Sequence, residues 1–464
     1  MAKSETVLQS VNPATGKTIR GYDAMDDSDV AKLLDKADAA QRIWMKRSLS
    51  ERAETLRHAA SVLKNRVDPC SRLMAEEMGK PLSQGRAEME KCAWVCNYYA
   101  DNAPVFLKDE PVETGARKSY IHYAPLGLVF AVMPWNFPFW QVFRFAAGAV
   151  MAGNGVALKH AENVTGCSLA IEEIFRDAGF PENLFCSLPI TRDSAGAVIG
   201  HPAVRAVTLT GSVEAGRTVA AMAGREMKKA VMELGGSDPY IILPDADMDN
   251  AVAKCVGSRL LNSGQTCISA KRFIVHKRIY EEFTDRFVRA MQSKTMGHPL
   301  DDPDIGPQAR GDLRDALHRQ VVESLEQGAS LLLGGEIPPK EGFFYPPTVL
   351  SDVTRSMPVF REETFGPVAA LIKADSETDA VEIANDSVYG LGAAIFTNDF
   401  EKGERIAREE LQAGSCFIND FVKSDPRLPF GGIKLSGYGR ELSFHGVREF
   451  TNIKTVYSTN PSSS

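Results

Sequence analysis

The chain has 464 residues, too many for a single hydrophobic core, so we expect two or three packed units. Apolar residues make up 44% and charged residues 24% of the sequence, which describes an ordinary globular protein and excludes a disordered or fibrous one. The net charge of −7 supplies no electrostatic attraction to nucleic acid or to an anionic membrane, so neither is expected as a partner.

The N-terminal sequence and the cysteines predict the compartment. The first residues contain no apolar stretch of the kind that forms a signal peptide. The most apolar segment, 137–158, is interrupted by Gln141 and Arg144, so we expect buried core and not a membrane span. The eight cysteines are scattered without disulfide spacing, and Cys92 and Cys96 lack the further ligands of a zinc site. We therefore predict a cytoplasmic protein without a metal.

The first hundred residues have the pattern of a helical scaffold. Apolar residues recur at helical spacing within 27–47, and Ser50 is a candidate N-cap for the helix that follows. Gly79 and Pro81 are expected to end the next helix, and another runs through 88–99. We expect these helices to support a site and not to form one.

From Tyr120 onward, strands and helices are expected to alternate. Apolar runs predict buried parallel strands at 127–133, 155–159, 204–209 and 229–232. Helices are expected from about 139, over 165–178 and near 213. This alternation predicts a doubly wound parallel sheet, which binds ligands at the carboxyl ends of its strands.

A second α/β region is expected from about Gly236. Its predicted helices are 248–261 and 280–293, and its predicted strands are 273–276, 393–396 and 415–418. The polar tail, 458–464, is expected to be frayed. The predicted fold class is therefore α/β, with a doubly wound parallel-sheet domain followed by a second α/β domain.

One predicted strand-to-helix turn contains Gly211, Ser212 and Gly216. Backbone N–H groups at the start of a helix, together with the Ser212 hydroxyl, can hold a pyrophosphate. Two glycines at such a turn are more often ordinary turn residues, so the pattern alone does not identify a nucleotide site.

Two other loops carry a thiol and a carboxyl group. Cys267 lies in a polar, glycine-containing loop, where its backbone N–H can donate to a developing oxyanion, although a lone cysteine is usually a small buried apolar residue. Glu233 follows the fourth strand and precedes a glycine pair, where partial desolvation would raise its pKa. A solvated loop carboxylate is the alternative. The residues alone leave both interpretations open.

Five motifs along the chain resemble those of the aldehyde dehydrogenase superfamily. They occur in family order and spacing between about residues 12 and 457, at 134–138 (PWNFP), 233–237 (ELGGS), 264–267 (GQTC), 363–367 (ETFGP) and 429–432 (PFGG). Five such agreements are not a matter of chance, so the chain is identified as a member of this superfamily.

The resemblance implies a reaction and a set of catalytic residues. Cys267 would attack the aldehyde as a thiolate, with the Asn136 amide and the Cys267 backbone N–H forming the oxyanion hole. Hydride would pass to a nicotinamide, and Glu233 would activate the water that hydrolyses the thioester. Relatives that transfer the acyl group to coenzyme A or phosphate generally lack this glutamate, so a free carboxylic acid is the expected product.

The resemblance also implies a nicotinamide dinucleotide as cofactor. Glu162 would meet the adenosine ribose, where a carboxylate accepts hydrogen bonds from both hydroxyls and repels a 2′-phosphate, so NAD is favoured and NADP is allowed. Glu363 would hold the nicotinamide ribose and Phe365 would pack near the nicotinamide. His160 stands where proline is commoner, which we interpret as a packing variation. The expected cofactor-binding residues are Met133, Pro134, Trp135, Lys159, Glu162, Gly211, Ser212, Leu234, Glu363 and Phe365.

Arg144 points to a carboxylated substrate. Succinate-semialdehyde dehydrogenases of the superfamily place an arginine here to grip the distal carboxylate, and the stretch 440–446 resembles their shorter bacterial members. An internal salt bridge is the alternative role for an arginine in so apolar a helix. Arg259 and Ser424 are further candidates, although better-known members carry their second arginine where this chain has Leu261.

Other functions stay open at this point. The substrate could instead be glutarate semialdehyde or a neutral aliphatic aldehyde. A protein of a different class, a non-catalytic binding or structural protein, could share the scaffold, but retention of Cys267, Glu233 and Asn136 argues against it.

The resemblance implies a division of the chain and its assembly. We expect an NAD(P)-binding domain of 1–106 and 126–235, a catalytic domain of 236–445, and a small β-ribbon oligomerisation element of 107–125 and 446–464. The ribbon would extend a neighbour's sheet and give a homodimer or homotetramer. Alternating residues in 119–123 fit such an edge.

Overall fold

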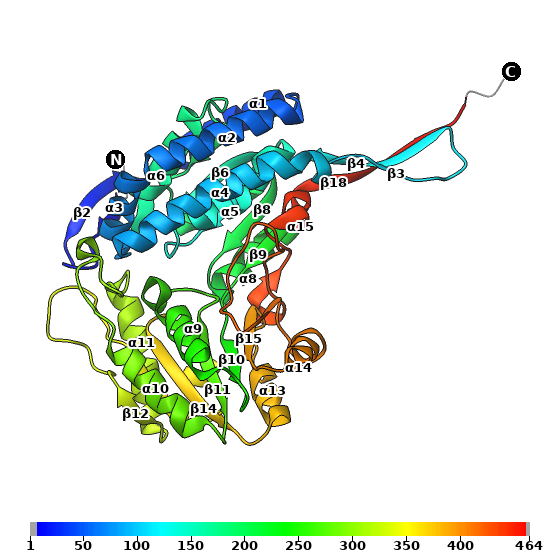
Figure 1. The fold of residues 1–464 in the computed structure, drawn as a ribbon. Helices are drawn as coiled ribbons and strands as arrows, with labels where there is room; N and C mark the ends of the chain where they lie inside the picture. The colour runs from blue at the N-terminus through cyan, green and yellow to red at the C-terminus, as the bar shows by residue number, and fades with distance from the viewer. Residues whose placement is uncertain (1–6, 461–464) are drawn as a thin grey trace.

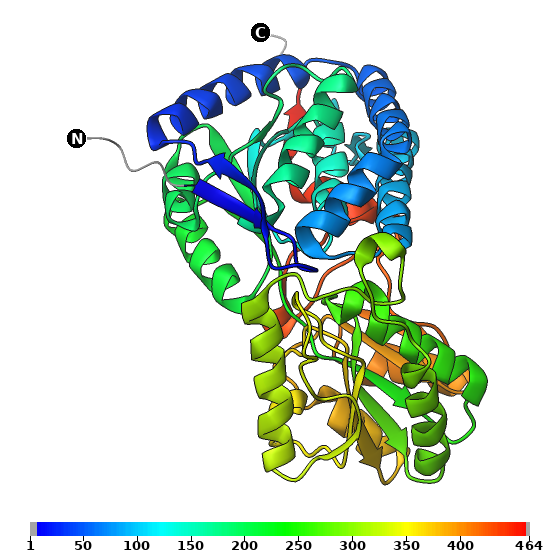
Figure 2. The same ribbon diagram turned by 90° about the vertical axis from the view of Figure 1, so that its left-hand side faces the viewer.

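The computed structural model describes residues 7–460, so the last part of the predicted frayed tail, 461–464, lies outside the described residues. Figure 2 shows two lobes, one above the other, and Figure 1 shows a β-ribbon that projects sideways from the first lobe. The structure confirms the predicted α/β fold class, with parallel sheets in both lobes.

The sheet of the first lobe has the order β17-β9-β8-β5-β6-β7, in which only β17 is antiparallel. The four predicted strands are confirmed to within about one residue at their ends. The chain leaves β5 toward β6 on one side and later returns to β8 on the other, so the order reverses between β5 and β8. Ligands of doubly wound sheets bind at this point. The strands are β5 (Leu128–Met133), β6 (Gly155–His160), β7 (Phe185–Ser187), β8 (Val204–Thr210), β9 (Lys229–Glu233) and β17 (Gly437–Tyr438).

Helices cover both faces of this sheet. On one face pack α5 (Trp140–Ala152) and α6 (Thr165–Asp177), beneath an outer layer of α2 (Leu49–Asn65), α3 (Val67–Met78) and α4 (Leu82–Phe106). On the other face pack α1 (Asp27–Trp44), α7 (Ala195–Gly200) and α8 (Val213–Arg225).

Helix α2 begins two residues earlier than the sequence suggested. The prediction of Ser50 as its N-cap is wrong: the cap is Ser48, whose side chain accepts a hydrogen bond from the backbone N–H of Glu51. The Glu51 carboxylate in turn accepts one from the backbone N–H of Ser48, which makes a capping box. The glutamate three residues after Ser48 is the sequence feature that identifies Ser48 as the N-cap.

The second lobe contains a seven-stranded sheet of order β12-β13-β14-β11-β10-β15-β16, antiparallel only between β12 and β13. Its strands are β10 (Asp238–Ile242), β11 (Ala270–His276), β12 (Ser330–Leu333), β13 (Thr348–Ser351), β14 (Val368–Ala374), β15 (Gly392–Phe396) and β16 (Ser415–Ile418). Its main helices are α9 (Met248–Leu260), α10 (Tyr280–Gln292), α11 (Gly311–Glu326), α13 (Glu377–Asn385) and α14 (Phe400–Arg405), with a single turn at α12 (Pro358–Arg361). The interior strand β10 was not predicted, because it opens with Asp-Pro, a pair that usually marks a turn.

The projecting ribbon is the antiparallel sheet β18-β4-β3, reached through α15 (Ser443–Glu449). Its strands are β3 (Glu110–Pro111), β4 (Lys118–Pro125) and β18 (Thr451–Ser458), and a separate hairpin near the N-terminus is formed by β1 (Val7–Val11) and β2 (Thr18–Asp23). In Figure 1 the ribbon extends well away from the rest of the chain. None of the helices in the described part of the chain is long and apolar enough to cross a membrane.

Candidate active site

The turn after β5 is fixed by a buried carboxylate. The backbone N–H groups of Phe139 and Trp140, at the start of α5, both donate to Glu88 Oε1 at 2.9 Å. Glu88 also forms a fully buried ion pair with Lys80, whose ammonium lies 3.8 Å from the centre of the Phe137 ring. A negative charge at the N-terminus of a helix is favourable, so Glu88 holds both α5 and the turn before it.

The nucleophile loop is joined to that turn by two amide side chains. Asn262 Nδ2 donates to the carbonyl oxygen of Asn136 at 2.7 Å, and Asn136 Nδ2 donates to the carbonyl oxygen of Gln265 at 3.0 Å. Asn262 and Ser263 both have left-handed backbone angles, with φ of 54° and 56°. Side-chain bonds to neighbouring backbone stabilise so unfavourable a conformation.

Two hydrogen-bond donors beside Cys267 have no acceptor within residues 7–460. They are the second N–H of the Asn136 side-chain amide and the backbone N–H of Cys267. Donors of this kind are the components of an oxyanion hole.

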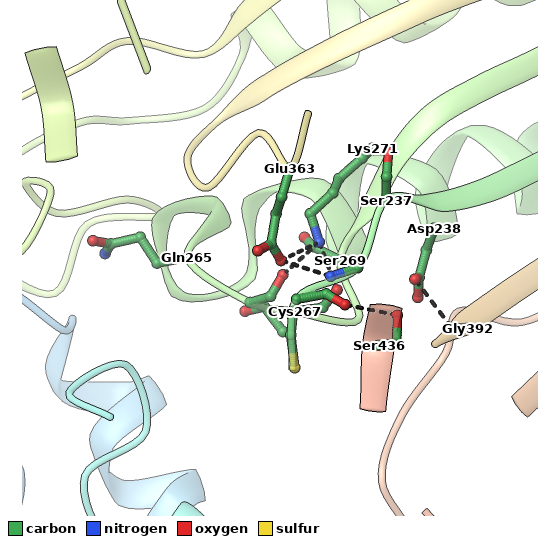
Figure 3. Close-up of polar contacts among 12 residues, drawn as sticks. Ser237, Asp238, Gln265, Cys267, Ser269, Lys271, Glu363, Gly392 and Ser436 are labelled. Atoms are coloured by element: carbon green, nitrogen blue, oxygen red, sulfur yellow. Dashed lines mark hydrogen bonds and ion pairs between the residues drawn. The ribbon is translucent and has the colours of Figure 1, made fainter. Parts of the chain in front are cut away.

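The Cys267 thiol needs activation. Burial raises its pKa to about 12, against the opposing influence of the Arg144 and Lys271 charges. Lys271 donates to the Cys267 carbonyl oxygen at 2.5 Å and pairs with Glu363 at 3.4 Å. Figure 3 shows the sulfur pointing away from this lysine–glutamate pair. A thiol with so high a pKa is almost fully protonated at neutral pH, so a base or a nearby positive charge must favour the thiolate.

Cys267 lies on a cavity of about 230 Å³ at the edge where β5 and β8 end. The rings of Trp135 and Phe365 meet there edge to face, with centroids 5.7 Å apart. The structure thus brings together most of the predicted cofactor and catalytic residues, since the lining includes Pro134, Trp135, Asn136, Gly211, Ser212, Leu234, Cys267, Glu363 and Phe365.

A second hollow lies at the end of β6. Its lining includes Lys159 and Glu162, as predicted residues, together with Arg192 and Arg310. Burial lowers the pKa of Lys159, an effect that the nearby Glu162 carboxylate opposes. The predicted residue Met133 is buried at the end of β5, where its carbonyl accepts a hydrogen bond from the backbone N–H of Ala161.

These residues fit a dinucleotide. Gly216 lies so close to Leu234 that a Cβ there would come within 2.5 Å of the leucine side chain, so the start of α8 packs tightly against the strand end. The first hollow has aromatic walls and a carboxylate for a nicotinamide riboside, and the second has polar and charged groups for an adenosine. Both lie at the carboxyl ends of strands of this sheet, and the first lies at the switch point between β5 and β8, where such cofactors bind.

His160 joins β6 to the turn after β5. Its Nε2 is 2.9 Å from the carbonyl oxygen of Pro138, and its Nδ1 accepts a hydrogen bond from the backbone N–H of Ala161. Burial lowers its pKa to about 4, so the imidazole is neutral and donates through Nε2. The departure from proline is therefore a buried packing and hydrogen-bonding variation.

Glu233, the last residue of β9, directly precedes Leu234 and Gly235 of the cavity lining but is not itself part of that lining. Its side chain lies against Gly431, where a Cβ would come within 2.6 Å of its Oε1. The side chain is buried and neither carboxylate oxygen has a hydrogen-bond partner in the described structure. Its pKa is raised well above the usual value, first by burial and then by the negative charge of Glu441, against the positive charge of Arg144. A carboxyl group in this environment is a stronger base than one in water.

Arg144 is paired inside the protein. Its guanidinium forms a buried ion pair with Glu441, donates to Thr210 Oγ1 at 3.2 Å and lies 4.5 Å from the centre of the Phe430 ring. This is the internal salt bridge that the sequence also allowed. An arginine that binds a substrate carboxylate would need a free positive charge. Here Glu441 already balances the charge of Arg144.

The other two predicted substrate residues differ in position. Arg259 is fully buried and donates from Nη2 to the Gly264 carbonyl oxygen at 2.6 Å, so it supports the nucleophile loop from within. Ser424 accepts hydrogen bonds from Lys91 and from the Trp140 indole, at 2.8 and 3.1 Å. Arg259 therefore contacts the nucleophile loop, whereas Ser424 contacts side chains of α4 and α5.

Several residues of the site were missed by the sequence reasoning. Glu88, Glu441 and Lys271 are charged, and all are buried. Long charged side chains are seldom buried unless they are paired, so the positions of Glu88 in helix α4 and of Lys271 in the apolar strand β11 were a usable signal. Glu441 lies in the segment between β17 and α15, where the sequence has no such signal. Their partners come from distant parts of the chain, which the sequence does not reveal.

Comparison with known proteins places the chain in a family. The sequence profile of the aldehyde dehydrogenase family matches residues 1–456. A relative from Escherichia coli (strain K12), named succinate semialdehyde dehydrogenase with NAD(P)+, is 47% identical over 97% of each chain. A Synechocystis relative, named probable succinate-semialdehyde dehydrogenase with NADP+, is 47% identical over 97% of this chain and 99% of its own.

A solved structure agrees with this likeness. The succinic semialdehyde dehydrogenase of Streptococcus pyogenes, in complex with NADP+ as the cofactor, superposes with a TM-score of 0.95 at 37% identity, over 98% of this chain and all of that one. The chain belongs to the aldehyde dehydrogenase family, as the sequence motifs indicated. It is an NAD(P)-dependent oxidoreductase that acts on an aldehyde.

The position of Arg259 predicts a specific kinetic result. Because it holds the Gly264 carbonyl from inside the protein, Arg259→Lys should shift the nucleophile loop and lower kcat by about 10²-fold, alike for charged and neutral aldehydes. Steady-state kinetics on both kinds of aldehyde measure this. A rise in KM confined to a carboxylated aldehyde would instead show that Arg259 contacts the substrate.

Proposed function

We propose that this enzyme oxidises succinate semialdehyde to succinate, with Cys267 as nucleophile and Glu233 as general base. The observation that supports the reaction is the placement of Cys267 on the cavity beside two unpaired N–H donors. The choice of substrate is supported by relatives of that name at 47% identity over nearly the whole chain. Glutarate semialdehyde and neutral aliphatic aldehydes are the alternative substrates.

Cys267 adds to the aldehyde carbon through its thiolate. The resulting negative charge on oxygen is stabilised by the Asn136 side-chain amide and the Cys267 backbone N–H, donors held in place before the reaction by Asn262 and Gln265. The nicotinamide, when bound, supplies the hydride acceptor. Lys271 holds the Cys267 carbonyl oxygen and so keeps the backbone of the nucleophile fixed throughout.

Glu233 acts in the second half of the reaction, as the base that takes a proton from the water attacking the Cys267 thioester. Its desolvated carboxylate has a raised pKa, which makes it a better proton acceptor near neutral pH. The product is then a free acid. Activity that depends on ionised Glu233 is present above its raised pKa and lost as the pH falls through it.

The cofactor is held by the two hollows. We propose that Trp135, Leu234 and Phe365 surround the nicotinamide with Glu363 on its ribose, and that Lys159 and Glu162 meet the adenosine ribose. The exposed Glu162 carboxylate favours NAD, while Arg192 and Arg310 in the same hollow also attract the 2′-phosphate of NADP. Use of both cofactors, with NAD preferred, is the expected outcome.

The three larger sheets support a division of the chain into domains. We propose that 1–106 and 126–235 form the cofactor domain, 236–445 the catalytic domain, and 107–125 with 446–464 an element that joins subunits. One strand inside the proposed catalytic range, β17, pairs with β9 at the edge of the cofactor sheet.

The eight cysteines are free thiols, as is typical of proteins in the reducing cytoplasm. We therefore propose that the enzyme is cytoplasmic, and cell fractionation tests this.

Kinetics on a matched pair of aldehydes test the function. With NAD and with NADP, kcat/KM for succinate semialdehyde should exceed that for butanal, which has the same number of carbons, by about 10²-fold, the range typical of a desolvated charge pair. Cys267→Ala should abolish NADH formation while cofactor binding, measured by fluorescence, is retained. Preference for butanal would refute the choice of substrate.

Glu233→Gln separates the two halves of the reaction. The amide cannot accept a proton, so hydrolysis of the thioester should slow by about 10²–10⁴-fold, whereas hydride transfer in the first turnover should persist. A stopped-flow trace should therefore show one equivalent of NADH per Cys267, followed by almost no turnover. Loss of this burst would instead place Glu233 before hydride transfer.

The ribbon predicts an oligomer. We propose that β4 and β18 bind a second subunit, because Ile453 and Tyr457 on β18 are 66% and 57% exposed and the ribbon extends away from its own chain. Ile453→Lys should convert a homodimer or homotetramer to smaller species in light scattering. Ile43→Lys, at an equally exposed residue of α1, is the control. A wild-type monomer would contradict the proposal.

A further inference from the structure

Lys271, the second residue of β11, holds the nucleophile loop from the side opposite the thiol. Its side chain is fully buried, and its ammonium donates to the Cys267 carbonyl oxygen at 2.5 Å and to the Thr266 carbonyl oxygen at 3.1 Å. It also pairs with Glu363 Oε1 at 3.4 Å. In Figure 3, dashed lines join Lys271 to the loop and to Glu363, and the Cys267 sulfur points away from them. One side chain therefore contacts the peptide groups on both sides of the nucleophile.

The groups around Lys271 favour its charged form. Its nitrogen contacts two carbonyl oxygens and one carboxylate oxygen, all of which are acceptors. A neutral amine has two hydrogens, whereas an ammonium has three and can donate to each of these oxygens. The backbone N–H of Gly236 donates to the same Glu363 oxygen at 3.0 Å and so fixes the counter-charge. The buried ammonium is thus paired and fully hydrogen-bonded.

The Thr266 carbonyl belongs to the same peptide group as the Cys267 backbone N–H. A peptide group is planar and trans, so its N–H points away from its carbonyl oxygen, and a donor that fixes the oxygen also fixes the N–H. The backbone N–H of Ser269 donates to this oxygen as well, at 3.2 Å, and closes the turn. Lys271 adds a positive charge at the oxygen, which polarises the peptide group and strengthens the N–H as a donor.

The two donors of the oxyanion hole therefore have separate supports. The Asn136 side-chain amide is oriented by its hydrogen bond to the Gln265 carbonyl oxygen at 3.0 Å. The Cys267 N–H has no acceptor within residues 7–460, and the carbonyl oxygen of its peptide group is the one that Lys271 and Ser269 hold. Of these supports, Lys271 is the one that brings a charge.

We propose that Lys271 is a positioning residue for the oxyanion hole, which aligns and polarises the Cys267 N–H through the Thr266 and Cys267 carbonyl oxygens. The inference deepens the proposed function and depends on it only for Cys267 as the nucleophile. It applies to any carbonyl compound that Cys267 attacks, so the identity of the aldehyde does not affect it. The effect on the N–H donor is distinct from any effect on the thiol, whose sulfur points away from the lysine.

Two reagents that react with the same thiol test the proposal without a cofactor. With p-nitrophenyl acetate, the Cys267 thiolate adds to the ester carbonyl, the carbonyl oxygen becomes negative, and p-nitrophenolate then leaves as the acetyl thioester forms. Iodoacetamide alkylates the thiolate by displacement of iodide and forms no oxyanion. The ratio of the two rate constants therefore measures the oxyanion hole and cancels any change in the fraction of thiolate. Subtraction of the rates of Cys267→Ala removes the contribution of the other cysteines.

Substitution of Lys271 should change this ratio. Lys271→Met, an apolar residue of similar length, should lower it by about 10²-fold, the effect of losing one oxyanion donor. Asn136→Ala removes the other donor and should lower it to a similar extent. Lys271→Gln keeps a neutral donor on a shorter side chain, should lower the ratio about tenfold, and replaces Lys271→Met if that variant does not fold. Lys277→Met removes an exposed lysine that pairs with Asp375 and should leave the ratio within about twofold.

The opposing outcomes are distinct. A ratio that stays unchanged in the Lys271 variants would overturn the proposal even if both rates fall, because Lys271 would then support the loop or the thiol and not the N–H donor. A fall of the same size in Lys277→Met would also overturn it, since the effect would not be specific to Lys271. A wild type that prefers butanal to succinate semialdehyde would refute the proposed substrate and leave the result with the two reagents as it is.

Discussion

The structure of the site depends on one carboxylate buried between two helices. Glu88 Oε1 accepts hydrogen bonds from the first two backbone N–H groups of α5, and Lys80 balances its charge. This contact sets where α5 begins, and α5 carries Trp140 and Arg144 on one face, four residues apart. The start of α5 also sets the position of the Asn136 turn before it and of the Arg144–Glu441 ion pair. A buried carboxylate with two backbone donors and a paired ammonium has its hydrogen-bonding and charge requirements satisfied, so it can hold these elements together.

The site contains two regions, one around Glu233 and one around Cys267, which differ in their charged groups. Around Glu233, two carboxyl groups and one guanidinium share a desolvated space, and the pKa of both carboxyl groups is raised. Around Cys267, the positive charges of Arg144 and Lys271 oppose the effect of burial on the thiol, and the negative charges of Glu363 and Asp238 add to it. The first region favours a proton acceptor, whereas in the second the net effect of the surroundings keeps the thiol protonated until it is activated. One helix, α5, supplies Arg144 to both, which couples the two regions without any direct bond between nucleophile and base.

Much of this could be predicted from the sequence. Four of the six strands of the cofactor sheet were predicted correctly because short, continuous apolar runs between turn residues are typical of buried parallel strands, and five motifs identified the family. The short strands β7 and β17 were not predicted. The cap of α2 was misplaced because two serines compete within three residues, and only the partner Glu51 distinguishes them. The pairing of Arg144 with Glu441 was not visible, since the two residues are far apart in sequence and meet only through the fold. The same is true of Lys91, Trp140 and Ser424, which come from three segments. Sequence patterns report periodicity and local turns, whereas the balance of charge in a site is a property of long-range contacts.

The strand β17 pairs with β9 directly beside Glu233, and Gly431 and Glu441 from the same late segment surround the Glu233 carboxyl group. Protein synthesis proceeds from the N-terminus, so the cofactor sheet and the nucleophile loop emerge from the ribosome well before this segment does. A nascent chain can therefore form its dinucleotide hollows and expose its thiol while its base still faces water with an ordinary acidity. The residues that desolvate Glu233 are therefore synthesised after the nucleophile loop and after the residues that line the two hollows.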